Sequence, residues 1–243
     1  MRDKTAAIIV IGNEILSGKV ADTNAAFLAQ ELRGLGVNLR RILVIPDEIA
    51  AIAEAVRTNH PAFDVLFTSG GVGPTHDDVT MAGVALGLGR RVIRHPLLER
   101  KIRDFSGEHI NEARLKMAEV PDGTELIFEG DLDFPTICVE NIYILPGIPE
   151  LFRAKFLAIR SRFAVDPFYL RVVYTRAAES SIAGYLNRTL QAFPALQLGS
   201  YPKLSDPAYR VRVTLESKDA EYVNRAFDHL LGQLPAEMVV RTE

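Results

Sequence analysis

The sequence of 243 residues has one cysteine, no tryptophan and no excess of charge of either sign. The lone Cys138, in the apolar run from Thr136 to Val139, excludes an internal disulfide and is typical of a small buried hydrophobic residue. A formal net charge of -3, without any run rich in lysine and arginine, gives no basic surface for nucleic acid. No apolar segment is long enough to span a bilayer, and the first one, Ala6 to Ile11, is too short for a secretory leader. These absences predict a cytoplasmic protein that binds neither nucleic acid nor membranes.

The chain does have an ample apolar supply, 48% of its residues, and a length that suits one large domain and one small one. Asp166 and Pro167 mark the expected boundary, which gives a first domain over residues 1–166 and a small α+β domain over 167–243. In the first domain, apolar runs alternate with amphipathic segments. This alternation predicts an α/β fold, a three-layer and mainly parallel sheet with helices on both faces.

The stretch from Phe63 to Thr80 predicts a buried strand, a glycine turn and the start of a helix. Its apolar run suits a strand covered on both faces, and Gly70, Gly71 and Gly73 allow a sharp turn that a ligand can approach closely. Thr75 and Asp78 have the spacing of a capping box, which predicts a helix from about residue 75. We expect its inner face to carry Val79, Ala82 and Leu86.

Free amides at the start of a helix attract phosphate, but this turn also carries the carboxylates of Asp77 and Asp78. A divalent cation between the carboxylates and phosphate oxygens would remove the repulsion. The alternative is that Asp78 only caps the helix and Asp77 is a solvated acid of its first turn.

Two earlier loops also follow predicted strands, and in a parallel sheet such loops meet at one edge. The first presents Glu14, Ser17 and Asp22, and the second presents Asp47. Acids that reach one edge from separate loops favour a cation and phosphate site. Taken singly, Asp22 would cap the following helix and Asp47 would start a turn.

The glycine stretch, Thr-Ser-Gly-Gly-Val-Gly-Pro-Thr-His-Asp-Asp-Val-Thr over residues 68–80, resembles the signature of the molybdopterin-binding (MoaB/Mog) superfamily. The His-Asp-Asp form is most similar to the CinA branch and to the related domain of FAD synthases. The resemblance implies a MogA-like fold for the first domain and covers essentially the whole chain.

Further motifs extend the resemblance. Residues 12–18 and 22–24 are similar to the opening signature of the CinA-type domain. Residues 46–48 match the second acidic loop of the family, and residues 145–150 match its proline-glycine turn. Asn13 stands where that family usually has an aspartate, which puts a role for that carboxylate in doubt. In the small domain, residues 179–183 and 198–203 resemble motifs of the FAD-synthase version. We expect the stand-alone form, without a deamidase or FAD-synthesising module after the small domain.

By position, the resemblance implies that Asp47 and Asp78 hold a divalent metal, Mg²⁺ or similar. In the Mog branch these acids are associated with handling of the pterin phosphate. The CinA branch is associated with metal-dependent hydrolysis of ADP-ribose, and the FAD-synthase domain with hydrolysis of FAD.

His76 would contact phosphate or be a bystander. The expected ligand-binding residues are Ser69, Gly70, Gly71, Gly73, Thr75, His76, Ser17, Asp22, Asn24, Pro146 and Gly147.

Three functions fit these observations. The leading one is a metal-dependent hydrolase of the pyrophosphate bond of ADP-ribose-like or FAD-like nucleotides, with Glu14 or Asp77 as the base. The second is a protein that binds molybdopterin or another pterin phosphate without turnover, linked to molybdenum cofactor biosynthesis. The third is a regulatory protein whose small domain recruits a partner. In each case we expect a homodimer.

Overall fold

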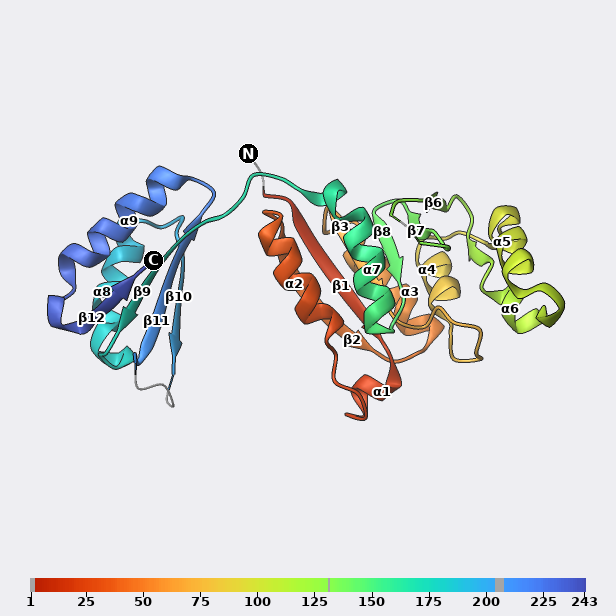
Figure 1. The fold of residues 1–243 in the computed structure, drawn as a ribbon, viewed down its shortest axis with the longest axis horizontal. Coiled ribbons are helices and arrows are strands. Elements are labelled where there is room, and N and C mark those ends of the chain that lie inside the picture. Colours follow the sequence, from red (N-terminus) through yellow and green to blue (C-terminus); the bar gives the residue numbers. More distant parts are fainter. Residues whose placement is uncertain (1–2, 131, 204–207) are drawn as a thin grey trace. The chain divides into compact units, whose positions relative to one another are not determined.

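A computed structural model describes residues 3–130, 132–203 and 208–243. The chain separates into two compact units, Met1–Val165 and Asp166–Glu243, each with its own hydrophobic core (Figure 1). None of the helices in the described residues is both long enough and apolar enough to cross a membrane.

The first unit is built on a six-stranded sheet in the order β2-β1-β3-β8-β7-β6. The strands β2, β1, β3 and β8 run parallel to one another, and β7 is antiparallel to both of its neighbours. The sheet is therefore mainly parallel, as the sequence predicted. The strands are β1 (Thr5–Ile11), β2 (Asn38–Ile45), β3 (Val65–Ser69), β6 (Glu125–Ile127), β7 (Thr136–Val139) and β8 (Ile142–Leu145).

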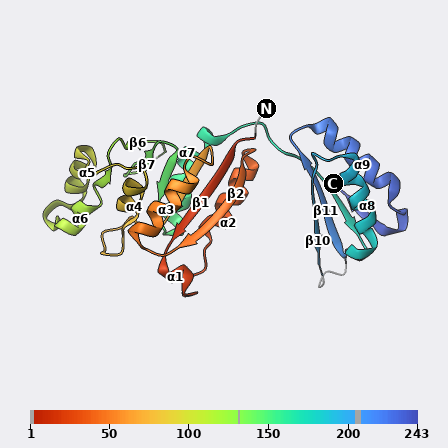
Figure 2. The ribbon, with the colours of Figure 1, turned by 180° about the vertical axis from the view of Figure 1, so that it is seen from behind.

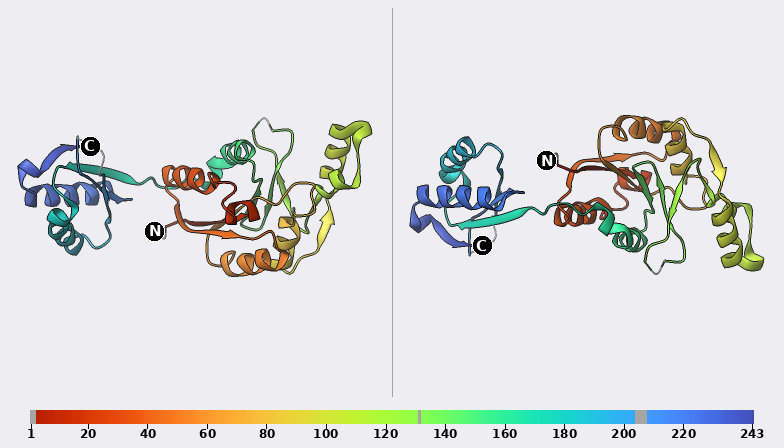
Figure 3. Two further views of the ribbon diagram at one scale, coloured as in Figure 1. Left: turned by 90° about the horizontal axis from the view of Figure 1, so that it is seen from below. Right: turned by 90° about the horizontal axis from the view of Figure 1, so that it is seen from above.

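Helices cover both faces of this sheet, because alternate residues of its central strands are apolar on both sides. In β1, Ile8 and Val10 pack against α2 and α7, whereas Ile9 packs against α3 and α4. The α2 and α7 layer lies in front in Figure 1, α3 lies in front in Figure 2, and Figure 3 shows the sheet between the two layers. The three-layer prediction is confirmed. The helices are α1 (Asn13–Leu16), α2 (Asn24–Gly34), α3 (Ile49–Asn59), α4 (Thr80–Gly87), α7 (Pro149–Ile159) and the short η2 (Arg160–Phe163).

The prediction of a helix from about residue 75 was wrong, because α4 begins at Thr80. Asp78 does bond back to Thr75, but the residues between them form a turn that no helix continues. The expected inner face was also wrong at Leu86, which is 51% exposed. The buried side of α4 includes Gly83, where a Cβ atom would lie 2.5 Å from the Ile52 side chain. The smallest residues of α4 thus face α3, which lets the two helices approach closely.

A segment of the first unit, residues 92–121, forms a small substructure with its own core. It contains β4 (Val92–Arg94), α5 (Pro96–Ser106), η1 (Gly107–His109), α6 (Glu112–Lys116) and β5 (Glu119–Pro121). The strands β4 and β5 pair antiparallel, and a separate cluster includes Leu98, Ile102, Leu115, Ala118 and Val120. Met81 of α4 packs against this cluster. The segment, named the 92–121 excursion below, is therefore attached beside the start of α4.

The second unit is a four-stranded antiparallel sheet in the order β10-β11-β9-β12. Its core joins Val213 and Leu215 of β11 to Ile182 of α8 and Leu230 of α9, so both helices pack against the sheet. The elements are β9 (Tyr169–Thr175), α8 (Glu179–Ala192), β10 (Gln197–Pro202), β11 (Val211–Ser217), α9 (Ala220–Gln233), η3 (Ala236–Met238) and β12 (Val239–Thr242). This small α+β arrangement agrees with the sequence prediction.

Candidate functional site

The carboxyl ends of β1, β2, β3 and β8 lie at one edge of the parallel sheet, and each is followed by a loop that carries expected site residues. These loops touch one another. Gly12 N donates to Ile45 O at 3.2 Å, and Gly70 N donates to Leu145 O at 3.2 Å. A Cβ atom on Gly147 would lie 3.2 Å from the Gly70 Cα atom. Four loops therefore form one continuous rim.

The glycine turn, residues 70–79, has a backbone that only glycine can form at its first two positions. Gly70 has φ +106, and a Cβ atom there would lie 2.1 Å from Ile11 O. Gly71 has φ +64, and its Cβ atom would lie 2.4 Å from Thr80 Oγ1. The buried Thr80 fixes the turn, because Oγ1 donates to Gly70 O at 2.8 Å and its amide donates to Gly71 O at 3.0 Å. The turn is thus held at both of its glycines.

Next to the two hydrogen bonds of Thr80, the turn has three consecutive backbone amides for which the described residues provide no acceptor. Within the described residues, the N–H groups of Gly71, Val72 and Gly73 donate no hydrogen bond. Successive free amides at a left-handed residue form a concave site that attracts anions. This arrangement can hold a phosphate oxygen.

The polar side chains of the turn bond mainly among themselves. Asp78 Oδ2 accepts from Thr75 N at 2.7 Å and from Thr75 Oγ1 at 2.5 Å. The nearby Thr75 hydroxyl and the backbone amide of Asp77 itself lower the pKa of the exposed Asp77 carboxyl. The side chain of His76 is 98% exposed, and its Nδ1 atom lies 3.9 Å from Asp77. His76 therefore points to solvent.

Two acids from different loops converge on the peptide that joins Gly12 and Asn13. Asp47 Oδ2 accepts from Asn13 N at 2.7 Å. The Glu14 carboxylate folds over Gly12, where a Cβ atom would lie 2.5 Å from Glu14 Oε1. Asn13 thus contributes its backbone amide, a role that does not need the aspartate usual at this position.

Asp47 and Asp78, the two expected metal ligands, form hydrogen bonds with different loops. Asp47 bonds to the first loop and Asp78 to its own turn. Among the residues that the structure describes, no three or more His, Cys, Asp or Glu side chains are grouped in a way that could hold a metal ion. A site of two acids stays a prediction.

A cleft of about 60 Å³ beside Asn24, the Asn24 cleft, brings together five of the expected ligand or catalytic residues: Glu14, Asp22, Asn24, Ser69 and Gly147. Asn24 is buried, and its Nδ2 atom donates to Ser69 Oγ at 2.9 Å and to Gly147 O at 2.8 Å. Its Oδ1 atom has no hydrogen-bond partner among the described residues. A buried acceptor without a donor is energetically costly, and a bound molecule that supplies a donor would remove this cost.

The remaining expected residues lie around these features. Asp22 Oδ1 accepts from the amides of Asn24 and Ala25 at 2.9 and 3.2 Å, which is the helix-capping alternative. Ser17 is exposed, and its Oγ atom donates to Glu14 O at 3.3 Å. Pro146 is half-buried in the loop after β8.

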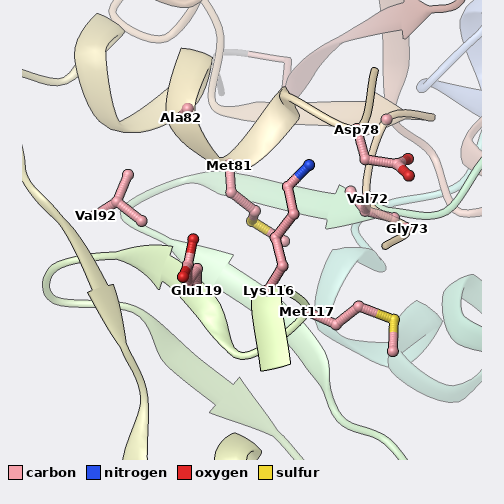
Figure 4. Close-up of a pocket in the computed structure, with 10 residues that line it drawn as sticks. Val72, Gly73, Asp78, Met81, Ala82, Val92, Lys116, Met117 and Glu119 are labelled. Carbon is pink, nitrogen blue, oxygen red and sulfur yellow. The ribbon is translucent and has the colours of Figure 1, made fainter. Parts of the chain in front are cut away.

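A second cleft of about 60 Å³, the glycine-turn cleft, contains residues that sequence reasoning missed (Figure 4). Lys116 donates from Nζ to Thr75 O, so a residue 41 positions away touches the glycine turn. No motif marked it, because only the fold of the 92–121 excursion brings it there. The lining residues are Gly71, Val72, Gly73, Asp78, Met81, Ala82, Val92, Lys116, Met117 and Glu119.

Two family models match the chain, one over each unit. Residues 7–163 match the model described as a probable molybdopterin binding domain. Residues 167–243 match the middle domain of FAD synthase.

A protein of Archaeoglobus fulgidus is 35% identical over 228 residues, which cover 93% of this chain and 97% of that protein. The probable FAD synthase of Caenorhabditis elegans is 32% identical over 264 residues, which cover 97% of this chain and 51% of that protein. The chain thus spans about half of the FAD synthase it matches. The crystal structure of CinA from Thermoplasma acidophilum, a protein of unknown function, is 31% identical with a TM-score of 0.61 and covers 67% of this chain and 100% of that one. With these matches, the chain belongs to the molybdopterin-binding domain family, and its second unit is similar to the middle domain of FAD synthase.

Proposed function

We propose that this protein is a divalent-metal-dependent hydrolase that cleaves the pyrophosphate bond of an ADP-ribose-like or FAD-like nucleotide. The observation that carries the proposal is the run of three free amides at residues 71–73, on a rim to which separate loops deliver carboxylates. The match of the second unit to an FAD synthase domain supports a nucleotide as the substrate.

The donor set at this rim suits a hard cation. Asp47 and Asp78 each use Oδ2 for hydrogen bonds, and within the described residues their Oδ1 atoms accept none. Two carboxylate oxygens with further positions left for water and phosphate are the usual ligands of Mg²⁺ on nucleotides. A bound divalent cation would offset the charge of the phosphates and make a bound water more acidic.

The chain's own groups would bind and orient the substrate. The amides of Gly71, Val72 and Gly73 donate to oxygens of one phosphate and also stabilise the charge that develops when the bond breaks. Of the two candidate bases, we choose Glu14 because its carboxylate lies over the same peptide that Asp47 binds. It would take the proton from the attacking water.

A product screen tests this function. The full chain is incubated with ADP-ribose, FAD and other dinucleotides in the presence of Mg²⁺, Mn²⁺ or Co²⁺, and products are separated by chromatography. We expect AMP with ribose 5-phosphate, or AMP with FMN, and no product after addition of a chelator. An absence of hydrolysis with every substrate and cation would contradict the proposal.

One observation favours a second candidate function, the binding of a pterin phosphate without turnover. Within the part of the chain that the structure describes, Asn24 Oδ1 is buried without a donor beside the Asn24 cleft, and the amino group of a pterin ring could supply one. In that case a pterin phosphate would raise the melting temperature in a saturable way and no product would form. Asn24→Leu, which keeps the size of the side chain and removes the Oδ1 acceptor, would weaken this shift far more than it weakens nucleotide hydrolysis.

We also infer a homodimer, which rests on the high apolar content. Light scattering at micromolar concentration would give about twice the chain mass of 26.9 kDa. A mass equal to that of one chain would contradict it.

A further inference from the structure

Lys116 brings a positive charge to a turn that otherwise carries acids. It is the last residue of α6, and its Nζ atom donates to Thr75 O in the middle of the glycine turn. Figure 4 shows its side chain extending from the 92–121 excursion toward the turn that carries Asp78. The same cleft is lined by Gly71, Val72 and Gly73, whose amides donate no hydrogen bond to any described residue. The residue with the ammonium group and the three residues with free amides therefore line one small space.

The two acids of this cleft already have other partners. Asp78 bonds to Thr75, and Glu119 pairs with Arg94 at 3.3 Å. Lys116, by contrast, forms no ion pair among the described residues and contacts only a neutral carbonyl. The positive charge of Lys116 is also one of the smaller causes of the lowered pKa of Asp77. A phosphate oxygen is a much stronger partner for an ammonium group than a carbonyl is.

The backbone at Lys116 is fixed by the core of the 92–121 excursion. Leu115 is 4% exposed and Ala118 is fully buried, and both belong to the separate cluster of this segment. The side chain of Lys116 thus starts from a rigid position, and only its flexible methylene groups need to move for the ammonium group to reach a neighbouring oxygen.

We propose that Lys116 is a phosphate-binding residue of the glycine turn. On ligand binding its ammonium group leaves Thr75 O and donates to non-bridging oxygens of a phosphate that sits on the amides of residues 71–73. Met81 and Met117 form an apolar wall beside that phosphate and contact the group that carries it. The inference rests on the same turn as the proposed hydrolase, but it requires only binding.

The test measures the affinity of the full chain for inorganic pyrophosphate by calorimetry, with and without Mg²⁺. Lys116→Met should weaken binding roughly tenfold to a hundredfold, the scale of one hydrogen bond between charged groups. Lys116→Arg keeps the charge and should stay within a few-fold of the wild type. The variant without the charge should also show a shallower dependence of affinity on salt.

Lys101→Met is the matched control. Lys101 lies in α5 of the same excursion and its Nζ atom also donates to a carbonyl, Asp133 O at 3.1 Å, but it does not line the glycine-turn cleft. This variant should bind pyrophosphate as the wild type does. A loss equal to that of Lys116→Met would mean a general effect of charge and would overturn the proposal.

Wild-type affinity in Lys116→Met, or no binding of pyrophosphate by the wild type under either condition, would also overturn it. If Lys116→Met lowers the melting temperature, Lys116→Gln replaces it, because the amide can still donate to a carbonyl while the charge is gone. Binding of pyrophosphate without release of any mononucleotide from dinucleotides would remove the hydrolase and leave the role of Lys116 intact.

Discussion

The two units of this chain differ in the sheet edges at which the loops after their strands lie. In the first unit, β2, β1, β3 and β8 are parallel, so the loops after them all reach one edge. In the second unit, neighbouring strands are antiparallel, so the loops after β9 and β10 leave at one edge and the loop after β11 leaves at the opposite edge. Polar groups from distant parts of the sequence can therefore gather on the first sheet, which is where we place the chemistry.

Glycine residues show the same difference. Gly70 and Gly71 of the first unit are in left-handed conformations and are packed so closely that no Cβ atom fits. Gly184 and Gly232 of the second unit lie in α8 and α9, and a Cβ atom there would meet at most the end of the Arg188 side chain at 3.6 Å. The first unit depends on Gly70 and Gly71 for the shape of the rim, whereas Gly184 and Gly232 in the helices of the second unit have room for larger residues.

The largest effect is expected for Gly70→Ala. The added Cβ atom would lie 2.1 Å from the backbone oxygen of Ile11, and alanine is strained at φ +106. Together, overpacking and backbone strain should lower the free energy of unfolding by roughly 3 to 5 kcal/mol. Denaturant unfolding followed by circular dichroism would measure it. Stability within about 1 kcal/mol of the wild type would contradict the close packing of this turn.

Asp47→Asn and Asp78→Asn test the chemistry placed in the first unit. Each keeps the size of the side chain but removes its charge, so turnover should fall roughly a hundredfold, which is about 2.7 kcal/mol of transition-state stabilisation. The double variant should lose little more than either single one, since both acids would serve one cation. Full metal-dependent turnover in either variant would refute the pairing, and an unchanged melting temperature would exclude a loss of fold as the cause.

Gly184→Ala tests the second unit and should stabilise the protein, whereas Gly70→Ala destabilises it. Alanine is the better helix former and has space there, so the free energy of unfolding should rise by about 0.5 to 1 kcal/mol. Nucleotide turnover should not change. A destabilised variant would show that the two units are less different in their use of glycine than the structure indicates.

A further effect concerns pH and appears only in alkaline solution. Burial lowers the pKa of Lys155 from 10.5 to about 8 in the folded protein, where its Nζ atom donates to Phe134 O and Pro135 O. Between those two pKa values the unfolded chain binds the proton and the folded chain does not, so stability should rise with pH across that window. Lys155→Met should remove this part of the slope, and Lys101→Met should keep it. Identical slopes in all three proteins would contradict the effect of burial.

Much of the architecture could be predicted from local patterns. Buried parallel strands appear as apolar runs, such as Val65 to Phe67, and the paired strands around Glu140 and Asn141 are marked by their two-residue spacing. The pattern also placed Pro149 in the first turn of α7. These features depend on residues close in sequence, so the sequence alone reveals them.

Features that depend on distant contacts could not be predicted. The capping-box spacing of Thr75 and Asp78 predicted a helix start, but Thr80 bonds to Gly70 and Gly71 and moves that start five residues along the chain. Lys116 reaches the turn only because the 92–121 excursion folds beside α4. The sequence identified the rim, while the tertiary fold determines which atoms on it are free.

The hydroxyl group of Thr80 has a consequence for how fast and how tightly a ligand can bind. By holding Gly70 O it fixes the backbone at the start of residues 71–73 before any ligand arrives. Binding then does not require the loop to be ordered, which removes an entropy penalty and leaves association limited mainly by encounter. Thr80→Val, which has nearly the same shape, should slow association and lower affinity although residue 80 need not touch the ligand. Part of the ligand affinity at this rim would then depend on the buried Thr80 side chain, which positions the backbone amides without touching the ligand.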